Sequence, residues 1–271
     1  MGSPPPGIYL PEFPQGTQWV NVPFIATGTL LGRSVPLVWF WDYCSLNSLR
    51  ALPYLQEWHR RYTEAGLRVI GVHSPQFEFA RDPDLVANAV RGLAIDFAIA
   101  LDPDFAIWRL YGNEVWPSLY LWDRRAKLCH YHFAEGGYDE TEAAIQRALL
   151  EIDAGLELPA PMVPIRLTDS PGALVKVPTP HSYLNDDRSG RPVGADEVLA
   201  ITYEGATAAA VLDGDTTAEL EVDGELRRIV RIQGPRLYKL VESGRQEEHE
   251  LKLRFRGEAR AYAFSFAPGP A

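Results

Sequence analysis

Candidate nucleophiles gather in one short run, Cys44-Ser45-Leu46-Asn47-Ser48, which follows an apolar segment and opens a helical pattern. The N-terminus of a helix stabilises a thiolate, so a thiol placed there can act as a nucleophile. Cys44 is therefore a candidate monothiol, and the alternative is a buried, inert thiol. The hydroxyls of Ser45 and Ser48 stay protonated near neutral pH, because a helix field of about 0.3 to 2 kcal/mol cannot ionise them.

The histidines and the second cysteine are weaker candidates. His73 ends an apolar segment, and open α/β sheets collect ligands at the ends of such strands; a structural hydrogen bond is the alternative role. His130 and His132 share one face of a predicted strand but supply only two ligands, so we predict no metal site, and we expect no cofactor. Cys129 points to the opposite face and is expected to pack there.

Several classes of function are excluded by composition. A serine hydrolase would need a Gly-x-Ser-x-Gly turn, which this chain lacks, and no glycine-rich phosphate loop is present. The net charge of −10 argues against nucleic acid or an anionic membrane as a partner. With only two cysteines, a disulfide-rich scaffold is also excluded.

No apolar run reaches the roughly 18 to 20 residues that a membrane span needs. The opening Met1–Gly7 lacks the basic and apolar regions of a signal peptide. We therefore expect no membrane segment, and a cytoplasmic location is favoured for the chain as it stands. An extracytoplasmic location would follow if a signal or anchor had been removed.

The first part of the chain alternates between strand and helix patterns, which is typical of an α/β sheet flanked by helices. All seven tryptophans lie in this part. Strands are expected at 35–41, 67–72, 97–101, 118–122 and 127–133, and helices at 46–65, 84–92, 105–111 and 139–152. The last two strands form a hairpin, so the sheet is mixed.

The second part reads as short alternating strands separated by turn signals such as Asp213-Gly214 and Asp223-Gly224. It is expected to form a smaller all-β sandwich with strands at 198–203, 207–212, 217–222, 228–232, 236–242, 249–255 and 259–266. Prolines crowd the stretch between the two parts, which favours an extended connector that packs on a surface through Ile165, Leu167 and Val175. The predicted domains are 1–155, a connector at 156–190, and 191–271.

Several longer motifs resemble TlpA-like redoxins, and in particular the soluble C-terminal part of DipZ-type thiol-disulfide proteins. The motifs span residues 40–55, 71–79, 116–121, 136–142, 179–184 and 236–241. The resemblance implies a thioredoxin fold followed by a jelly-roll-like β-sandwich that resembles a carbohydrate-binding module. It also implies a cis peptide bond between Trp116 and Pro117, beside the turn that carries the family's active site.

The active-site turn departs from the family pattern F-W-x-x-x-C-x-x-C. The two cysteine positions hold Ser45 and Ser48, and Cys44 lies one residue too early. The family exchanges disulfides with a dithiol, in which one thiolate attacks and the second thiol resolves the mixed disulfide. We therefore expect this exchange to be absent. Either the dithiol was lost naturally, as Ala134 in place of an expected glycine also indicates, or the cysteines were replaced deliberately, as the opening Met-Gly-Ser favours.

Three functional hypotheses follow. The first is a redox-inactive protein that binds a peptide or protein in the groove formed by Trp41, Tyr43, Asn47, His73, Trp116 and Pro117. The second is a thiol-disulfide oxidoreductase, seen as a Cys-to-Ser form or acting through Cys44. The third is a carbohydrate-binding protein that uses the β-domain, although its aromatic residues are expected to lie in the core. These aromatic residues are Tyr238, Phe255, Tyr262, Phe264 and Phe266.

Overall fold

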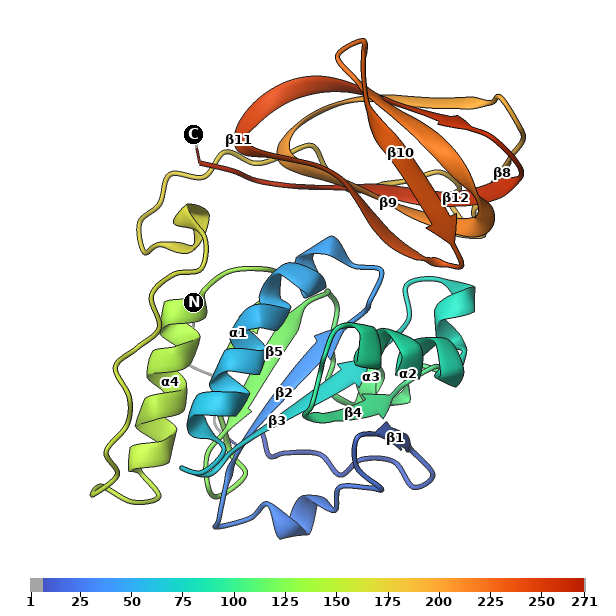
Figure 1. Ribbon diagram of the computed structural model, residues 1–271. Helices are drawn as coiled ribbons and strands as arrows, with labels where there is room; N and C mark the ends of the chain where they lie inside the picture. Colours follow the sequence, from blue (N-terminus) through green and yellow to red (C-terminus); the bar gives the residue numbers. More distant parts are fainter. Residues whose placement is uncertain (1–6, 271) are drawn as a thin grey trace. The chain divides into compact units, whose positions relative to one another are not determined.

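The chain divides into two compact units, Met1–Ile165 and Arg166–Ala271 (Figure 1). The structure, a computed structural model, describes residues 7–270. Most of the opening stretch in which we expect no signal peptide, residues 1–6, therefore lies outside the described residues, as does residue 271. Within the described range, no helix is both long and apolar enough to cross a membrane.

The first unit is built on a mixed sheet of six strands, which confirms the predicted α/β sheet flanked by helices. Strands β2, β3 and β4 run parallel, and the other neighbours are antiparallel. In spatial order the strands are β1 (Gln18–Val20), β4 (Ala98–Leu101), β3 (Leu67–His73), β2 (Val35–Trp41), β5 (Ser118–Trp122) and β6 (Leu128–Phe133).

Strand β2 lies in the middle of this sheet, and all of its residues are buried. Helices α1 (Leu46–Tyr62) and α4 (Tyr138–Leu150) pack over one face of the sheet (Figure 1). On the other face, Val38 and Phe40 join a core cluster with Ile107 of α3 (Ala106–Leu110) and with Leu10 and Leu30 of the N-terminal segment. A strand covered on both faces needs apolar residues at every position, which explains the continuous apolar run.

The helices are α1 (Leu46–Tyr62), α2 (Pro83–Gly92), α3 (Ala106–Leu110) and α4 (Tyr138–Leu150), with 3-10 turns η1 (Thr27–Thr29) and η2 (Glu78–Arg81). The sequence pattern missed β1, which adds to the free edge of β4. Three residues are too few to show a periodicity, so only the tertiary pairing identifies this strand.

The first unit extends to residue 165 because a buried carboxylate ties the chain after α4 to the helices. Glu142 is 2% exposed and accepts hydrogen bonds from the Tyr62 hydroxyl at 2.6 Å, Arg61 Nη1 at 3.1 Å and the Met162 backbone N–H at 2.8 Å. Burial raises the pKa of Tyr62 to about 12, so its hydroxyl remains a donor. The expected boundary at residue 155 thus differs from the division after Ile165.

The second unit is all β apart from the turn η3 (Leu167–Asp169), which confirms the predicted all-β region. Strands β10, β9, β12 and β7 are neighbours in that order, while β11 also pairs with β9 and β8 with β12. The strands are β7 (Ser182–Tyr183), β8 (Arg191–Val193), β9 (Val198–Val222), β10 (Glu225–Gln233), β11 (Arg236–Phe255) and β12 (Ala259–Ala267).

Strand β9 corrects the expected strand divisions, because it joins three predicted strands into one. Gly214 has φ 146 and pairs with Ala259, so it redirects the strand without ending it. The Asp223-Gly224 turn does separate β9 from β10, as predicted. Strand β11 likewise spans two predicted strands. Since β9 pairs with β10, β11 and β12, the described strands are joined in one network and do not form two separately bonded sheets.

The stretch expected as a connector is shared between the two units, and strand β7 within it pairs with β12 of the second unit. Of its apolar residues that we expect to pack on a surface, Leu167 is 75% exposed and does not do so. Ile165 and Val175 are 47% and 39% exposed, and Ile165 also donates its backbone N–H to the Tyr54 hydroxyl at 2.8 Å.

Candidate functional site

The turn between β2 and α1 is held by a buried aspartate that the sequence analysis missed. Asp42 Oδ1 accepts a hydrogen bond from the Cys44 backbone N–H at 2.5 Å, and Oδ2 accepts one from the Gln76 N–H at 2.6 Å. The carboxylate therefore joins the loop after β2 to the loop after β3. The available signal was an aspartate two residues before a backbone donor, which is typical of an Asx turn.

Both serines of the turn hold backbone groups in place. Ser45 is the N-cap of α1, and its Oγ accepts a hydrogen bond from the Ser48 N–H at 3.2 Å. Ser48 is fully buried, and its Oγ accepts from the Asp42 N–H at 3.4 Å. The Ser45 hydroxyl thus satisfies a donor that the start of a helix would otherwise leave unpaired, and the Ser48 hydroxyl satisfies a donor of the turn before it. Cys44 is also fully buried.

His73, at the end of β3, lies beside this turn. Its ring stacks on Tyr43 with centroids 5.3 Å apart and meets Trp41 edge-on at 5.2 Å. Its Nε2 lies 3.9 Å from Asp42 Oδ2 and makes no hydrogen bond within the described chain. Burial lowers the pKa of His73 to about 3, so the imidazole is neutral at physiological pH.

The remaining turn residues lie at different depths. Trp41 is fully buried and stacks on Trp39 at 4.9 Å, so its ring belongs to the core beneath the turn. Asn47 is half-buried in the first turn of α1. The structure thus brings both Trp41 and Tyr43 into contact with His73.

A second loop reaches the same end of the sheet. The peptide bond between Trp116 and Pro117 is cis, and Trp116 Nε1 donates a hydrogen bond to the Ser74 carbonyl at 2.9 Å, next to His73. Trp116 itself is half-buried. Within the described residues, its backbone N–H and C=O make no hydrogen bond. A residue with both backbone groups unpaired can pair with an extended chain.

This second loop is held by Asn113, which the sequence analysis also missed. Asn113 is 5% exposed, and its Nδ2 donates to the Val115 carbonyl at 3.1 Å. Its Oδ1 accepts hydrogen bonds from the hydroxyls of Ser118 at 2.6 Å and Tyr120 at 3.0 Å. The pair Gly112-Asn113 signals a turn in the sequence, but not these contacts. The loop before β5 is therefore fixed from both sides.

A further buried carboxylate joins the ends of β3 and β4. Asp102 accepts hydrogen bonds from the Ser74 hydroxyl and from the backbone N–H groups of Ile107 and Trp108, each at 2.9 Å. Burial raises the pKa of its carboxyl group. These contacts position α3 next to the second loop.

The other candidates lie away from the turn. On β6, Cys129 Sγ donates to the Leu121 carbonyl at 3.3 Å, and His130 Nε2 lies 3.1 Å from Thr141 Oγ1. His132 packs against Gly137, where an added Cβ would lie 2.5 Å from its ring. Among the residues that the structure describes, no group of three or more potential metal ligands occurs.

The aromatic residues considered for sugar stacking are all buried in the second unit. None of the five rings is more than 7% exposed, and four of them belong to the core cluster of this unit. They therefore offer no stacking surface. The five are Tyr238, Phe255, Tyr262, Phe264 and Phe266.

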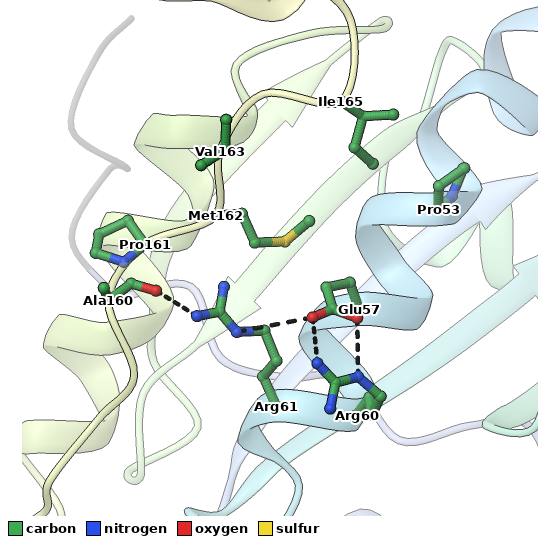
Figure 2. Close-up of a pocket in the computed structure, with 9 residues that line it drawn as sticks. All are labelled: Pro53, Glu57, Arg60, Arg61, Ala160, Pro161, Met162, Val163 and Ile165. Atoms are coloured by element: carbon green, nitrogen blue, oxygen red, sulfur yellow. Dashed lines mark hydrogen bonds and ion pairs between the residues drawn. The ribbon is translucent and has the colours of Figure 1, made fainter.

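A groove of about 610 Å³ lies between α1 and the segment 160–165 (Figure 2). Its charged side chains pair among themselves, since Glu57 accepts from Arg60 at 2.5 Å and lies 3.9 Å from Arg61 Nε. The hydrogen bond from Arg60 lowers the pKa of Glu57. The groove therefore presents neutralised ion pairs and apolar side chains, without a candidate nucleophile.

Comparisons with known proteins found one family model and several curated relatives that match parts of the chain. The family model described as "Thioredoxin like C-terminal domain" matches residues 182–267. The chain is 38% identical over 154 residues to Protein DipZ of Mycobacterium tuberculosis, covering 56% of this chain but only 22% of that protein. It is 26% identical over 144 residues to the thiol-disulfide oxidoreductase YkuV of Bacillus subtilis, covering 53% of this chain and 96% of YkuV.

Among solved structures, a thiol-disulfide isomerase from Corynebacterium glutamicum matches with a TM-score of 0.48 and 22% identity, covering 52% of this chain and 96% of that one. The chain spans about a fifth of the length of the DipZ protein that it matches. The chain is thus similar to a thiol-disulfide oxidoreductase, and residues 182–267 of its second unit match the thioredoxin-like C-terminal domain.

Proposed function

We propose that the first unit is a redox-inactive binding module of the thioredoxin-like type, which holds an extended peptide or protein segment beside Trp116 and Pro117. In the thiol-disulfide proteins that the chain resembles, the loop with the cis-proline offers backbone groups to a peptide. Ser45 and Ser48 stand where those proteins carry the two thiols that exchange disulfides. Two groups of contacts support the two halves of this proposal.

The chemistry fails because hydroxyls stand at Ser45 and Ser48, where the resemblance places thiols. Disulfide exchange needs a thiolate that attacks and a second thiol that resolves the mixed disulfide. The Ser45 hydroxyl instead accepts the hydrogen bond that caps α1, and the Ser48 hydroxyl accepts from Asp42. Both serines therefore have a structural role that does not need ionisation.

Binding depends on the backbone of Trp116, and this single observation carries the proposal. Its N–H and C=O are unpaired and lie in a loop that two hydrogen bonds hold in place. The Asn113 side chain donates to the Val115 carbonyl, and the Trp116 indole donates to the Ser74 carbonyl. A preorganised loop loses little conformational entropy on binding, so two backbone hydrogen bonds to a partner can add to affinity. An extended peptide supplies the matching acceptor and donor.

Two measurements test the proposal. In the insulin reduction assay with dithiothreitol, the chain should give no acceleration over the uncatalysed reaction. On an array of unstructured decapeptides it should bind a subset, and binding should slow hydrogen exchange at the Trp116 amide, because that amide becomes a donor to the peptide. Acceleration of insulin reduction, or binding without protection of Trp116, would overturn the proposal.

Neither the monothiol form of the second hypothesis nor the carbohydrate-binding hypothesis has specific support. Cys44 is fully buried, with its backbone N–H held by Asp42, so its thiol is not presented to a substrate. Of the five aromatic rings considered for sugar stacking, four lie in the core cluster of the second unit and the fifth, that of Tyr262, is 7% exposed. Neither a monothiol enzyme nor a carbohydrate-binding function is therefore proposed.

A further inference from the structure

The ring of Trp116 packs with two other aromatic rings beside the unpaired backbone groups of this residue. Phe105, Trp108 and Trp116 are each half-buried. Ring centroids of Trp108 and Trp116 lie 4.2 Å apart, and Phe105 lies 5.8 Å from Trp108 and 6.3 Å from Trp116, meeting both edge-on. We call these three rings the aromatic shelf. The neighbouring Val115 is 37% exposed and extends the apolar surface.

Phe105 adopts an unusual backbone conformation within this shelf. Its φ of 59 and ψ of 28 place it in the left-handed region, at the N-cap of α3, where it forms no side-chain cap. Glycine or asparagine enters this region readily, whereas a bulky side chain is strained there. Strain of this kind is concentrated at binding and catalytic sites. Phe105 has a strained backbone and a ring that is partly open to solvent, which fits a role in contacting a ligand.

The acidic groups next to the shelf are already paired. Arg81 Nη1 lies 3.6 Å from Asp104 Oδ1, and Arg81 Nε lies 3.0 Å from Glu78 Oε2. Arg109 Nη1 donates to the backbone carbonyl of Asp104 at 2.8 Å, which is a neutral acceptor. A basic side chain of a partner would therefore find these two carboxylates occupied by Arg81. A neutral, apolar side chain loses its contact with water without leaving a charge unpaired.

We propose that the shelf selects peptides with a bulky apolar side chain, preferably aromatic, next to the backbone that pairs with Trp116. This inference rests on the proposed function, since it names the class of peptide that the same loop binds. Contact with the shelf buries the guest side chain, and edge-on contacts between aromatic rings are favourable. Full burial of a large apolar side chain corresponds to a gain in affinity of about tenfold or more.

The test uses the full chain and a set of matched decapeptides that differ only at one central position. The central residue is Phe, Leu, Ser, Lys or Asp, and the flanking residues are the best set from the peptide array. Affinities are measured by fluorescence polarisation. We expect the Phe peptide to bind about tenfold more tightly than the Ser peptide, with Leu between them.

The deciding variant is Phe105→Asn, because asparagine tolerates the left-handed conformation while removing the ring. Its Tm should stay within roughly 4 °C of the parent, while the preference for Phe over Ser falls to about twofold or less. Ile229→Asn, which removes an apolar side chain that is 64% exposed in the second unit, is the matched control and should keep the full preference.

Each outcome decides between the two proposals. If all peptides bind equally well, the shelf does not select and this inference fails, while the proposed function stands. A preference for the Lys peptide would mean that the rings recognise a cation and would overturn the inference. If no peptide binds to the parent chain, the proposed function fails and the shelf fails with it. A strongly destabilised Phe105→Asn variant that keeps the preference would assign Phe105 to the core.

Discussion

Restoring thiols at the turn should restore disulfide chemistry, which makes Ser45→Cys/Ser48→Cys the most informative double variant. The two positions are the N-cap and the third helical residue of α1. Helix geometry puts residues of this spacing about 5 Å apart between Cα atoms. A disulfide accepts Cα separations of roughly 4.4 to 6.8 Å. The backbone is therefore already suited to a reversible disulfide.

The cost in stability follows from the two hydrogen bonds that would be lost. Replacing the N-cap Ser45 removes the acceptor for the Ser48 N–H, which lies 3.2 Å away, and such a loss costs about 1 kcal/mol. The Ser48 hydroxyl accepts from Asp42 at 3.4 Å, a long hydrogen bond worth about 0.5 kcal/mol. We expect the reduced double variant to lose about 1 to 2 kcal/mol of unfolding free energy.

The assay combines urea unfolding under reducing conditions with insulin reduction by dithiothreitol. The double variant should accelerate insulin reduction, whereas the parent and the matched variant Ser45→Ala/Ser48→Ala should not. The alanine variant should show a similar loss of stability, because it lacks the same acceptors. A folded double variant without insulin reductase activity would refute the inference that the missing thiols alone prevent exchange. A loss above about 4 kcal/mol would refute the assignment of the serines as simple caps.

Four further predictions concern single residues. Cys44 should resist alkylation by iodoacetamide in the folded chain at pH 7 to 8 and should react only after unfolding in urea, because its side chain is buried. Peptide mass spectrometry measures the labelling, and labelling of the folded chain would contradict this burial. Glu142→Ala should cost about 2 to 4 kcal/mol in urea unfolding, because it leaves the buried Tyr62 hydroxyl and the Met162 amide without their acceptor and removes one carboxylate partner of the half-buried Arg61. Glu142→Gln should cost less, and equal losses would argue against the ion pair. Ala134 has φ 69, so Ala134→Gly should raise stability by about 1 kcal/mol in thermal unfolding, and a decrease would contradict the strain. Burial lowers the pKa of His73 to about 3, so between pH 6.5 and pH 3 the unfolded chain binds a proton that the folded chain does not. Stability should therefore fall as the pH drops through this window, by up to about 1.4 kcal/mol per pH unit, and His73→Gln should flatten that slope.

Much of the first unit could be predicted from its sequence, because its elements have strong local patterns. The apolar run that forms β2 and the helical spacing of α1 identify themselves without tertiary information. Strand β1 could not be predicted, since it is short and exists only through its pairing with β4. In the second unit, the pair Asp213-Gly214 has the composition of a turn, but the backbone conformation of Gly214, with φ 146, continues β9. A glycine permits both outcomes, and only the pairing partner decides between them.

The site shows the same division between local pattern and tertiary contact. Its candidate residues were found because hydroxyls, a thiol and an aromatic-proline pair stand out in the sequence. Asp42, Asn113 and Asp102 were missed, although they hold the loops together. A buried polar residue has the same appearance in a sequence as an exposed one, and its role depends on donors that lie far along the chain.

By itself, the sequence determined which chemistry is possible: it places serines at the turn and leaves the chain with two cysteines. It also determined the main elements, because side-chain periodicity is local. Only the tertiary structure decided that Trp116 has unpaired backbone groups, that Phe105 is strained beside it, and that Glu142 fixes the chain up to Ile165. The physical reason is that hydrogen bonds and burial depend on distances between segments remote in sequence, which no local pattern encodes.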